Sequence, residues 1–216
     1  MTARRHPPHC PYCSVGTPST DDHIFARAFF PKNKREKHPK VMACQLCAVK
    51  KSKLEEYVMN SISFAGRHSD AVEMANISLD VRLKKNQKMA RELAAGVIVG
   101  DGVSRSSTIE VDVNKHLSLS CMWSQGLSWV AFDHLTSPGD SISAAIADFT
   151  YGRSFVYSIG PCITWNKSFG SGAVTVLGTQ SATDGRSQRW MFNLYDIRLA
   201  ENVDESAVFL VDIGPK

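Results

Sequence analysis

Cys10-Pro-Tyr-Cys13 and Cys44-Gln-Leu-Cys47 decide how the first part of this sequence folds. Each pair forms a tight knuckle that presents two sulfurs to one ion, and four thiolates complete a tetrahedral zinc site with no open coordination position. A redox dithiol needs only one pair and a surrounding βαβ pattern, which is missing here. We therefore predict one structural zinc ion per chain, bound by the four cysteines.

The remaining cysteines and the apolar pattern indicate where the protein resides. Cys121 and Cys162 are isolated and are interpreted as buried small hydrophobic residues. Arg4 and Arg5 near the N-terminus are followed by no apolar run, and no stretch approaches the roughly 18 apolar residues that span a bilayer. We expect a soluble cytoplasmic protein without a membrane partner.

Charge is divided unevenly along the chain. Residues 1–100 hold 17 Lys and Arg against 9 Asp and Glu, whereas residues 101–216 hold 8 against 12. The bias is sharpest from Arg4 to Lys53, where 11 basic residues face 3 acidic ones. A basic block of this kind attracts polyanions, above all nucleic-acid phosphates, although a solvated basic loop has the same composition.

Three segments differ in texture and together predict an α+β fold. Residues 1–66 are rich in Cys, His, Pro and Lys, and form a unit too small to fold by apolar burial without a metal. Residues 67–104 are expected to be a helical connector that ends in a glycine-rich loop. Residues 105–216 are expected to form an α+β domain of unknown role, dominated by antiparallel sheet.

Periodicity predicts the individual elements. A helix is expected over 54–66, beginning either at Ser52, which with Glu55 resembles a capping box, or earlier, at the second cysteine pair. A second helix is expected over 69–95, with a break at 76–80. In the last segment, one helix is expected over 141–149, and strands are expected over 108–113, 128–132, 154–158, 173–178, 189–198 and 207–212.

An adjacent acid and base lie between the two cysteine pairs. Asp22 and His23 occur within Thr20-Asp-Asp-His-Ile-Phe25. A carboxylate is a hard oxygen ligand for a divalent ion, and imidazole is a base of suitable pKa. Phosphodiester hydrolysis needs both a metal that stabilises charge and a base that activates water. The pair alone is a weak motif, and a surface loop would also contain it, but the four-cysteine frame strengthens it.

Together, the two cysteine pairs, Asp22-His23-Ile24 and Lys51-Ser52 resemble the HNH endonuclease family of the ββα-metal superfamily, in its type with four cysteine zinc ligands. The resemblance covers about residues 10–56, a quarter of the chain. It implies two strands and a helix around one divalent ion, usually Mg²⁺ or Mn²⁺, beside the scissile phosphate. His23 would be the general base and Asp22 the first ligand of the catalytic ion.

Ala48 departs from the family pattern. Family members usually have Asn or His directly after the second cysteine pair, and this side chain completes the metal site. Ala offers no ligand atom, so the chain is a variant made to bind without cutting, a naturally inactive relative, or a chain in which Asn33 or His38 substitutes. We favour the first explanation. His38 is also the nearest candidate for the middle position of the motif, although we favour its interpretation as a plain solvent-facing loop histidine.

Several basic side chains are candidates for phosphate contact, with Lys51 foremost because it lies three residues after Ala48 on the same helix face. The others are Arg27, Lys32, Lys34, Arg35, Lys37, Lys50 and Lys53.

Three functions follow from these observations. They are a metal-dependent endonuclease, active or disabled, with DNA favoured as substrate; a zinc-dependent nucleic-acid-binding module without catalysis; and a nuclease that its C-terminal domain regulates. That acidic domain could also dimerise or recognise a regulatory partner. Its aromatic residues, which include all four tryptophans, are interpreted as sheet core with a few rim positions, or else as a stacking surface for bases or a pocket for a small ligand.

Overall fold

The computed structural model describes residues 6–35, 38–95, 97–99, 107–109, 111–198 and 206–216. Its elements, in chain order, are β1 (Thr20–His23), η1 (Arg27–Phe29), η2 (Lys32–Lys34), β2 (Lys40–Ala43), α1 (Gln45–Ala65), α2 (Ser69–Ile77), the π-helical η3 (Ser78–Arg82), α3 (Leu83–Lys85), α4 (Gln87–Ala95), β3 (Val97–Val99), β4 (Ser107–Ile109), α5 (Val113–Phe132), β5 (Asp140–Asp148), α6 (Phe149–Tyr157), β6 (Cys162–Phe169), β7 (Val174–Ser181), β8 (Gln188–Arg198) and β9 (Ser206–Pro215). The α+β fold class predicted from the sequence is confirmed.

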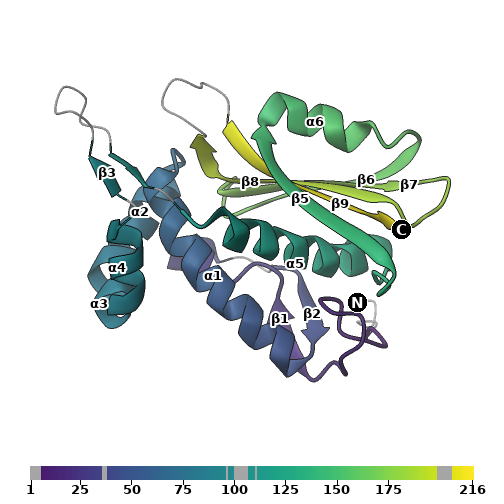
Figure 1. The fold of residues 1–216 in the computed structure, drawn as a ribbon, viewed down its shortest axis with the longest axis horizontal. Coiled ribbons are helices and arrows are strands. Elements are labelled where there is room, and N and C mark those ends of the chain that lie inside the picture. The colour runs from purple at the N-terminus through teal and green to yellow at the C-terminus, as the bar shows by residue number, and fades with distance from the viewer. Residues whose placement is uncertain (1–5, 36–37, 96, 100–106, 110, 199–205) are drawn as a thin grey trace.

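A five-stranded antiparallel sheet organises the C-terminal half. Its strand order is β5-β9-β8-β7-β6. Helix α6 covers one face of this sheet, and α5 lies along the other face (Figure 1). On its far side α5 contacts α1 and β2. The small N-terminal elements are thus attached to the sheet through α5, and α1 also contacts β8 directly.

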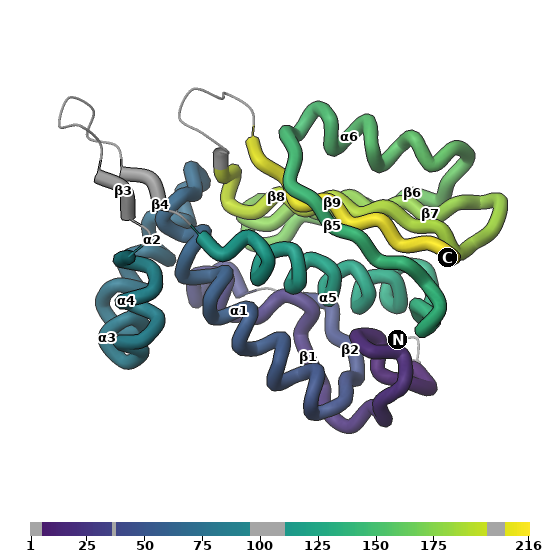
Figure 2. The backbone as a smooth tube through the Cα atoms, in the orientation of Figure 1, coloured from purple at the N-terminus to yellow at the C-terminus, as the bar shows by residue number. Residues whose placement is uncertain are grey.

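The N-terminal elements form a ββα unit, which we call the ββα module. Strands β1 and β2 pair antiparallel, with Thr20 opposite Ala43 and His23 opposite Lys40. Helix α1 follows at once, with Cys44 as its N-cap residue. The helix therefore begins at the second cysteine pair, the earlier of the two starts expected. Figure 2 shows the N-terminal coil folded beside this hairpin, near the end of α5.

One hydrophobic core joins the module to the rest of the chain. Phe25, just after β1, lies with its ring centroid 5.1 Å from that of Trp123 on α5 and 5.2 Å from that of Phe169 on β6. Gly126 allows α5 to approach closely, since a Cβ there would lie 3.0 Å from Cε1 of Tyr12 and 3.2 Å from Cγ1 of Ile24. The module is therefore supported by apolar packing as well as by its cysteines.

Hydrogen bonds to backbone carbonyls hold the loop that follows β1. The Tyr195 hydroxyl, on β8, donates a hydrogen bond to the carbonyl of Phe29, and Arg82 donates to the carbonyl of Ala28 at 3.0 Å. Tyr195 has a positive φ of 53°, at an irregularity in the β8–β9 pairing. The sheet thus contacts the ββα module through Tyr195, a residue whose backbone is locally strained.

Three expected elements of the C-terminal half are wrong in type. The strand predicted over 128–132 is the end of helix α5, and the strand predicted over 154–158 lies in helix α6. The helix predicted over 141–149 is almost entirely strand β5. Its alanines favour a helix, but pairing along the whole of β9 overrides that weak preference. Strands β7, β8 and β9 lie close to the predicted ranges.

The helix expected over 69–95 and the strand expected over 108–113 are each found in part. The helix expected over 69–95 is divided into α2, the π-helical η3, α3 and α4, so the expected break is present. The strand expected over 108–113 is shorter, because β4 ends at Ile109 and α5 begins at Val113. Glu110, between these two elements, lies outside the described residues.

Candidate functional site

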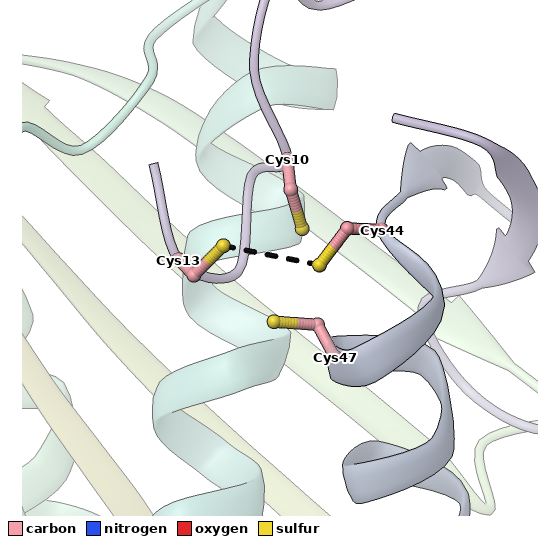
Figure 3. A group of neighbouring side chains, drawn as sticks. All are labelled: Cys10, Cys13, Cys44 and Cys47. Atoms are coloured by element: carbon pink, nitrogen blue, oxygen red, sulfur yellow. Dashed lines mark hydrogen bonds between the residues drawn. The ribbon is translucent and has the colours of Figure 1, made fainter. Parts of the chain in front are cut away.

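The four cysteines of the predicted zinc site converge. Cys10 and Cys13 come from the coil before β1, Cys44 caps α1, and Cys47 lies in its first turn (Figure 3). Their sulfurs all lie within 4.8 Å of one another, and the Cys13 and Cys44 sulfurs are 3.9 Å apart. Four sulfurs placed about 2.3 Å from a tetrahedral zinc ion are separated by roughly 3.8 Å. The cluster could therefore hold a metal ion such as zinc.

The backbone around the cluster is shaped for thiolates. The amide of Gly16 lies 3.3 Å from the Cys13 sulfur, and the Cys10 amide donates to the Gly16 carbonyl at 2.7 Å. Burial raises the pKa of Cys13, but the hydrogen bonds from the Val15 and Gly16 amides lower it to about 7. A Cβ on Gly16 would lie 2.9 Å from the Cys44 sulfur, so only glycine fits there without displacement.

The β1–β2 hairpin has two unlike faces. Side chains alternate along a strand, so Asp22 lies on the face that also carries the buried Val41. His23 lies on the opposite face, with its cross-strand partner Lys40 and with Asp21. We call the face of Asp22 the inner face of the hairpin and the face of His23 the outer face. The two predicted site residues therefore leave β1 on different sides, at the end of the strand.

On the inner face, Asp22 belongs to a buried charge network. Its Oδ2 accepts a hydrogen bond of 2.6 Å from the Tyr12 hydroxyl and lies 3.1 Å from Nζ of Lys51. The same ammonium group donates to Glu55 Oε1 at 2.6 Å and to the His23 carbonyl at 2.7 Å. Burial raises the pKa of Glu55, although the charge of Lys51 lowers it. The network is compact because Lys51 and Glu55 are one helical turn apart on α1.

Lys51 corrects a sequence-based prediction. Its side chain is 0% exposed, so it does not reach a phosphate from solvent. The prediction that Lys51 is the foremost phosphate contact is therefore wrong. It shares one face of α1 with Ala48, as expected, but that face is turned towards β1. Helical spacing predicts that Ala48 and Lys51 share one face of α1, but it does not predict whether that face points to solvent or to β1.

His23, on the outer face, lies half-buried near charges of both signs, since the carboxylates of Asp21 and Asp22 partly oppose two nearby cations. Burial lowers its pKa, and the charges of Lys40 and Arg27 lower it further. The imidazole is consequently neutral near pH 7 and can accept a proton. Lys40 is itself held by Asp21 at 2.9 Å. Lys40 is absent from the predicted phosphate contacts. It lies four residues before Cys44, so a hairpin between the two cysteine pairs would place it opposite His23. That position is the sequence signal from which Lys40 could have been predicted.

A divalent ion finds few ligands at Asp22. Ala48 has no ligand atom, and a lysine ammonium already lies beside the carboxylate. Within the described part of the chain, the cysteines are the one group of three or more His, Cys, Asp and Glu side chains positioned for an ion. The residues present therefore do not fit a catalytic Mg²⁺ or Mn²⁺ site.

The two candidate substitutes for the missing ligand differ in position. His38 is 5% exposed and stacks on Phe30 with ring centroids 4.3 Å apart. It belongs to the core, so the predictions of a site ligand and of a solvent-facing loop are both wrong. Its contacts with Phe30 and with Phe169, whose ring centroid lies 5.7 Å away, explain this burial. Asn33 is exposed within η2.

The remaining predicted phosphate contacts differ in availability. Lys34 forms an ion pair with the buried Asp70, and Arg35 donates to the Phe30 carbonyl at 3.1 Å. Lys37 lies outside the described residues. The candidates that are exposed are Arg27, Lys32, Lys50 and Lys53.

Comparison with known proteins identifies no relative. No family model matches the chain, and neither the curated proteins nor the solved structures include a match. Among the described helices, none has the length and apolar character that crossing a membrane requires.

Proposed function

We propose that this chain is a nucleic-acid-binding protein built on an HNH-type ββα module, and that it binds its substrate without cutting it. The observation that carries the proposal is the arrangement of the module. Asp22 and His23 end the first strand of a hairpin, and the helix that follows begins inside a four-cysteine cluster. This order is what the family resemblance implies.

Binding is supported by the charge around His23. Arg27 and Lys40 both act on the His23 imidazole, and Arg27 is exposed to solvent. Two cations beside a neutral imidazole form a place where one phosphate group can be held. DNA is the favoured polymer, and these contacts are to the backbone, so they give affinity rather than sequence choice.

The residues on the inner face of the hairpin support the proposed absence of cleavage. The position that would supply the second metal ligand is Ala48, and Asp22 is neutralised by Lys51 instead of by a divalent ion. His23 can still accept a proton on the outer face. A base without the metal supplies only part of what phosphodiester hydrolysis needs, so the chain retains binding and loses the reaction.

The four cysteines are proposed to hold a structural zinc ion. Bound zinc would fix the coil before β1 to the first turn of α1, and a site of four thiolates has no open position for a substrate. All six cysteines are unpaired, which supports a reducing compartment such as the cytoplasm.

The test is substitution of Ala48 by Asn. Ala48→Asn supplies an amide oxygen on the α1 face that carries Lys51. Because the Lys51 ammonium group still lies beside Asp22, and His23 lies on the other face of the hairpin, neither this variant nor the unsubstituted chain is expected to cut with Mg²⁺ or Mn²⁺. Both forms would be incubated with plasmid DNA, single-stranded DNA and RNA, with Ala48→Val as the matched control. Cutting by the unsubstituted chain would refute the proposed loss of reaction. Cutting by Ala48→Asn but not by Ala48→Val would refute the part assigned to Lys51 and to the position of His23, and would show that one missing ligand alone accounts for the loss.

A further inference from the structure

A small pocket opens on the outer face of the hairpin, and Lys40, the cross-strand partner of His23, is one of its lining residues. Its volume is about 260 Å³. That is below the roughly 300–1,000 Å³ of sites for drug-sized ligands, and is the scale of a single ring system. The pocket is lined by His6, Pro7, Asp21, Lys40, Val41, Met42 and Trp129.

The pocket is built by two distant parts of the chain. Lys40 and Met42 come from β2, whereas Trp129 comes from the last turns of α5. Trp129 is partly exposed, unlike Trp123 and Trp190, which are 1% and 0% exposed and belong to the core. Trp129 therefore presents part of its indole to a cavity rather than only to neighbouring side chains.

The pocket and the proposed phosphate position share Lys40. His23 is directly opposite Lys40 in the hairpin, and Asp21 is opposite Met42, so all four side chains belong to the outer face. The ammonium group has three donors, of which the ion pair with Asp21 uses one. A phosphate bound at Lys40 and His23 would thus have an aromatic pocket directly beside it.

We propose that this pocket receives one nucleobase of the bound strand, stacked on the indole of Trp129. The inference rests on the proposed nucleic-acid binding and adds its local substrate requirement: a base that is unpaired and free to leave the strand's own stack. Every base has an aromatic face, so the pocket selects single-stranded or distorted nucleic acid without selecting sequence.

The pocket also assigns a role to α5. The C-terminal half is acidic overall, and so is a poor primary binder of a polyanion. Through Trp129 it contributes an uncharged stacking surface at the edge of the basic module. The sheet and α5 therefore complete the binding site rather than merely support it.

The experiment measures the affinity of the full chain for two matched oligonucleotides. One is a six-nucleotide single-stranded DNA, and the other has the same phosphates but an abasic sugar at every position. Stacking of one base typically changes affinity by about 5- to 140-fold. The complete oligonucleotide is expected to bind more tightly by a factor in this range. The advantage should shrink in Trp129→Leu, which keeps apolar packing but removes the aromatic face.

Tyr151→Leu is the matched control, because Tyr151 is an exposed aromatic residue on α6, on the opposite face of the sheet. Circular dichroism and metal content would verify that each variant is folded. If Trp129→Leu does not fold, equal binding of the two oligonucleotides by the unsubstituted chain still refutes the base pocket.

The outcomes separate the two proposals. Equal binding of the complete and abasic strands by the unsubstituted chain would overturn the base pocket and leave phosphate binding intact. A preference for the complete strand that persists in Trp129→Leu would also overturn it. Absence of binding to either strand would overturn the proposed function itself, and the pocket with it.

Discussion

Replacing Lys51 by methionine tests the buried charge network most severely. Lys51 is 0% exposed and lies between Asp22 Oδ2, at 3.1 Å, and Glu55 Oε1, at 2.6 Å. Methionine keeps a long apolar side chain and removes the ammonium group. Two carboxyl groups, with side chains 18% and 8% exposed, then lose their shared cation.

The magnitude follows from that burial. Removing one partner of a buried ion pair typically lowers the free energy of unfolding by about 3–5 kcal/mol, because the other charge is left uncompensated. For a chain of about 200 residues, each kcal/mol corresponds to roughly 2–4 °C. Lys51→Met is therefore expected to lower the melting temperature by about 6–20 °C.

The assay is thermal unfolding followed by circular dichroism at fixed total zinc, since bound metal also shifts the melting temperature. Lys50→Met is the matched control, because Lys50 is the neighbouring helix residue and is exposed; its effect should stay within about 0.5 kcal/mol. The double variant Lys51→Met with Glu55→Gln removes one uncompensated charge and should recover part of the loss. Equal melting temperatures for the two methionine variants would refute the reasoning.

Two further predictions concern Gly16 and Glu55. Gly16→Ala would place a Cβ 2.9 Å from the Cys44 sulfur, so this variant should release metal at a lower chelator concentration. Gly139→Ala is the control, because nothing lies within 4 Å of a Cβ at that position. Equal metal release from the two variants would contradict the geometry. Burial raises the pKa of Glu55 above its ordinary value, so the folded state binds the proton more tightly and this group's contribution to stability is lost as pH rises through the raised pKa. The melting temperature of the unsubstituted chain minus that of Glu55→Gln should thus decrease between about pH 4 and pH 8, and an increase would mean that the attraction to Lys51 outweighs burial.

The parts of the site that the sequence predicts are those fixed by local spacing. Two Cys-x-x-Cys pairs can present four sulfurs to one ion whatever the surrounding fold, and the cluster is confirmed. The hairpin is what the family resemblance implies, and the start of α1 at the second cysteine pair is one of the two starts that the sequence left open. The direction of Lys51 cannot be predicted in this way, because it depends on β1 packing across α1, and no pattern within the helix reports that contact.

The errors in the C-terminal half have a related cause. Helix α5 buries His116, Leu119, Trp123 and Leu127 at helical spacing, but the serines between them hide the apolar period. Several of these serines satisfy their hydroxyls on the helix's own backbone, as Ser120 does on the His116 carbonyl. Without α5 in place, neither its contact with the hairpin nor the pocket at Trp129 can be inferred from the sequence.

The salt dependence of oligonucleotide binding tests the central claim most directly. Affinity for single-stranded DNA would be measured from about 50 to 200 mM salt for the unsubstituted chain, for Arg27→Ala with Lys40→Ala, and for the control Lys167→Ala on β6. The account predicts a steep loss of affinity with salt, and a slope reduced by about 1 for each phosphate contact removed, in the double variant alone. A flat dependence, or the same slope in all three proteins, would contradict the assignment of the phosphate to Arg27, Lys40 and His23.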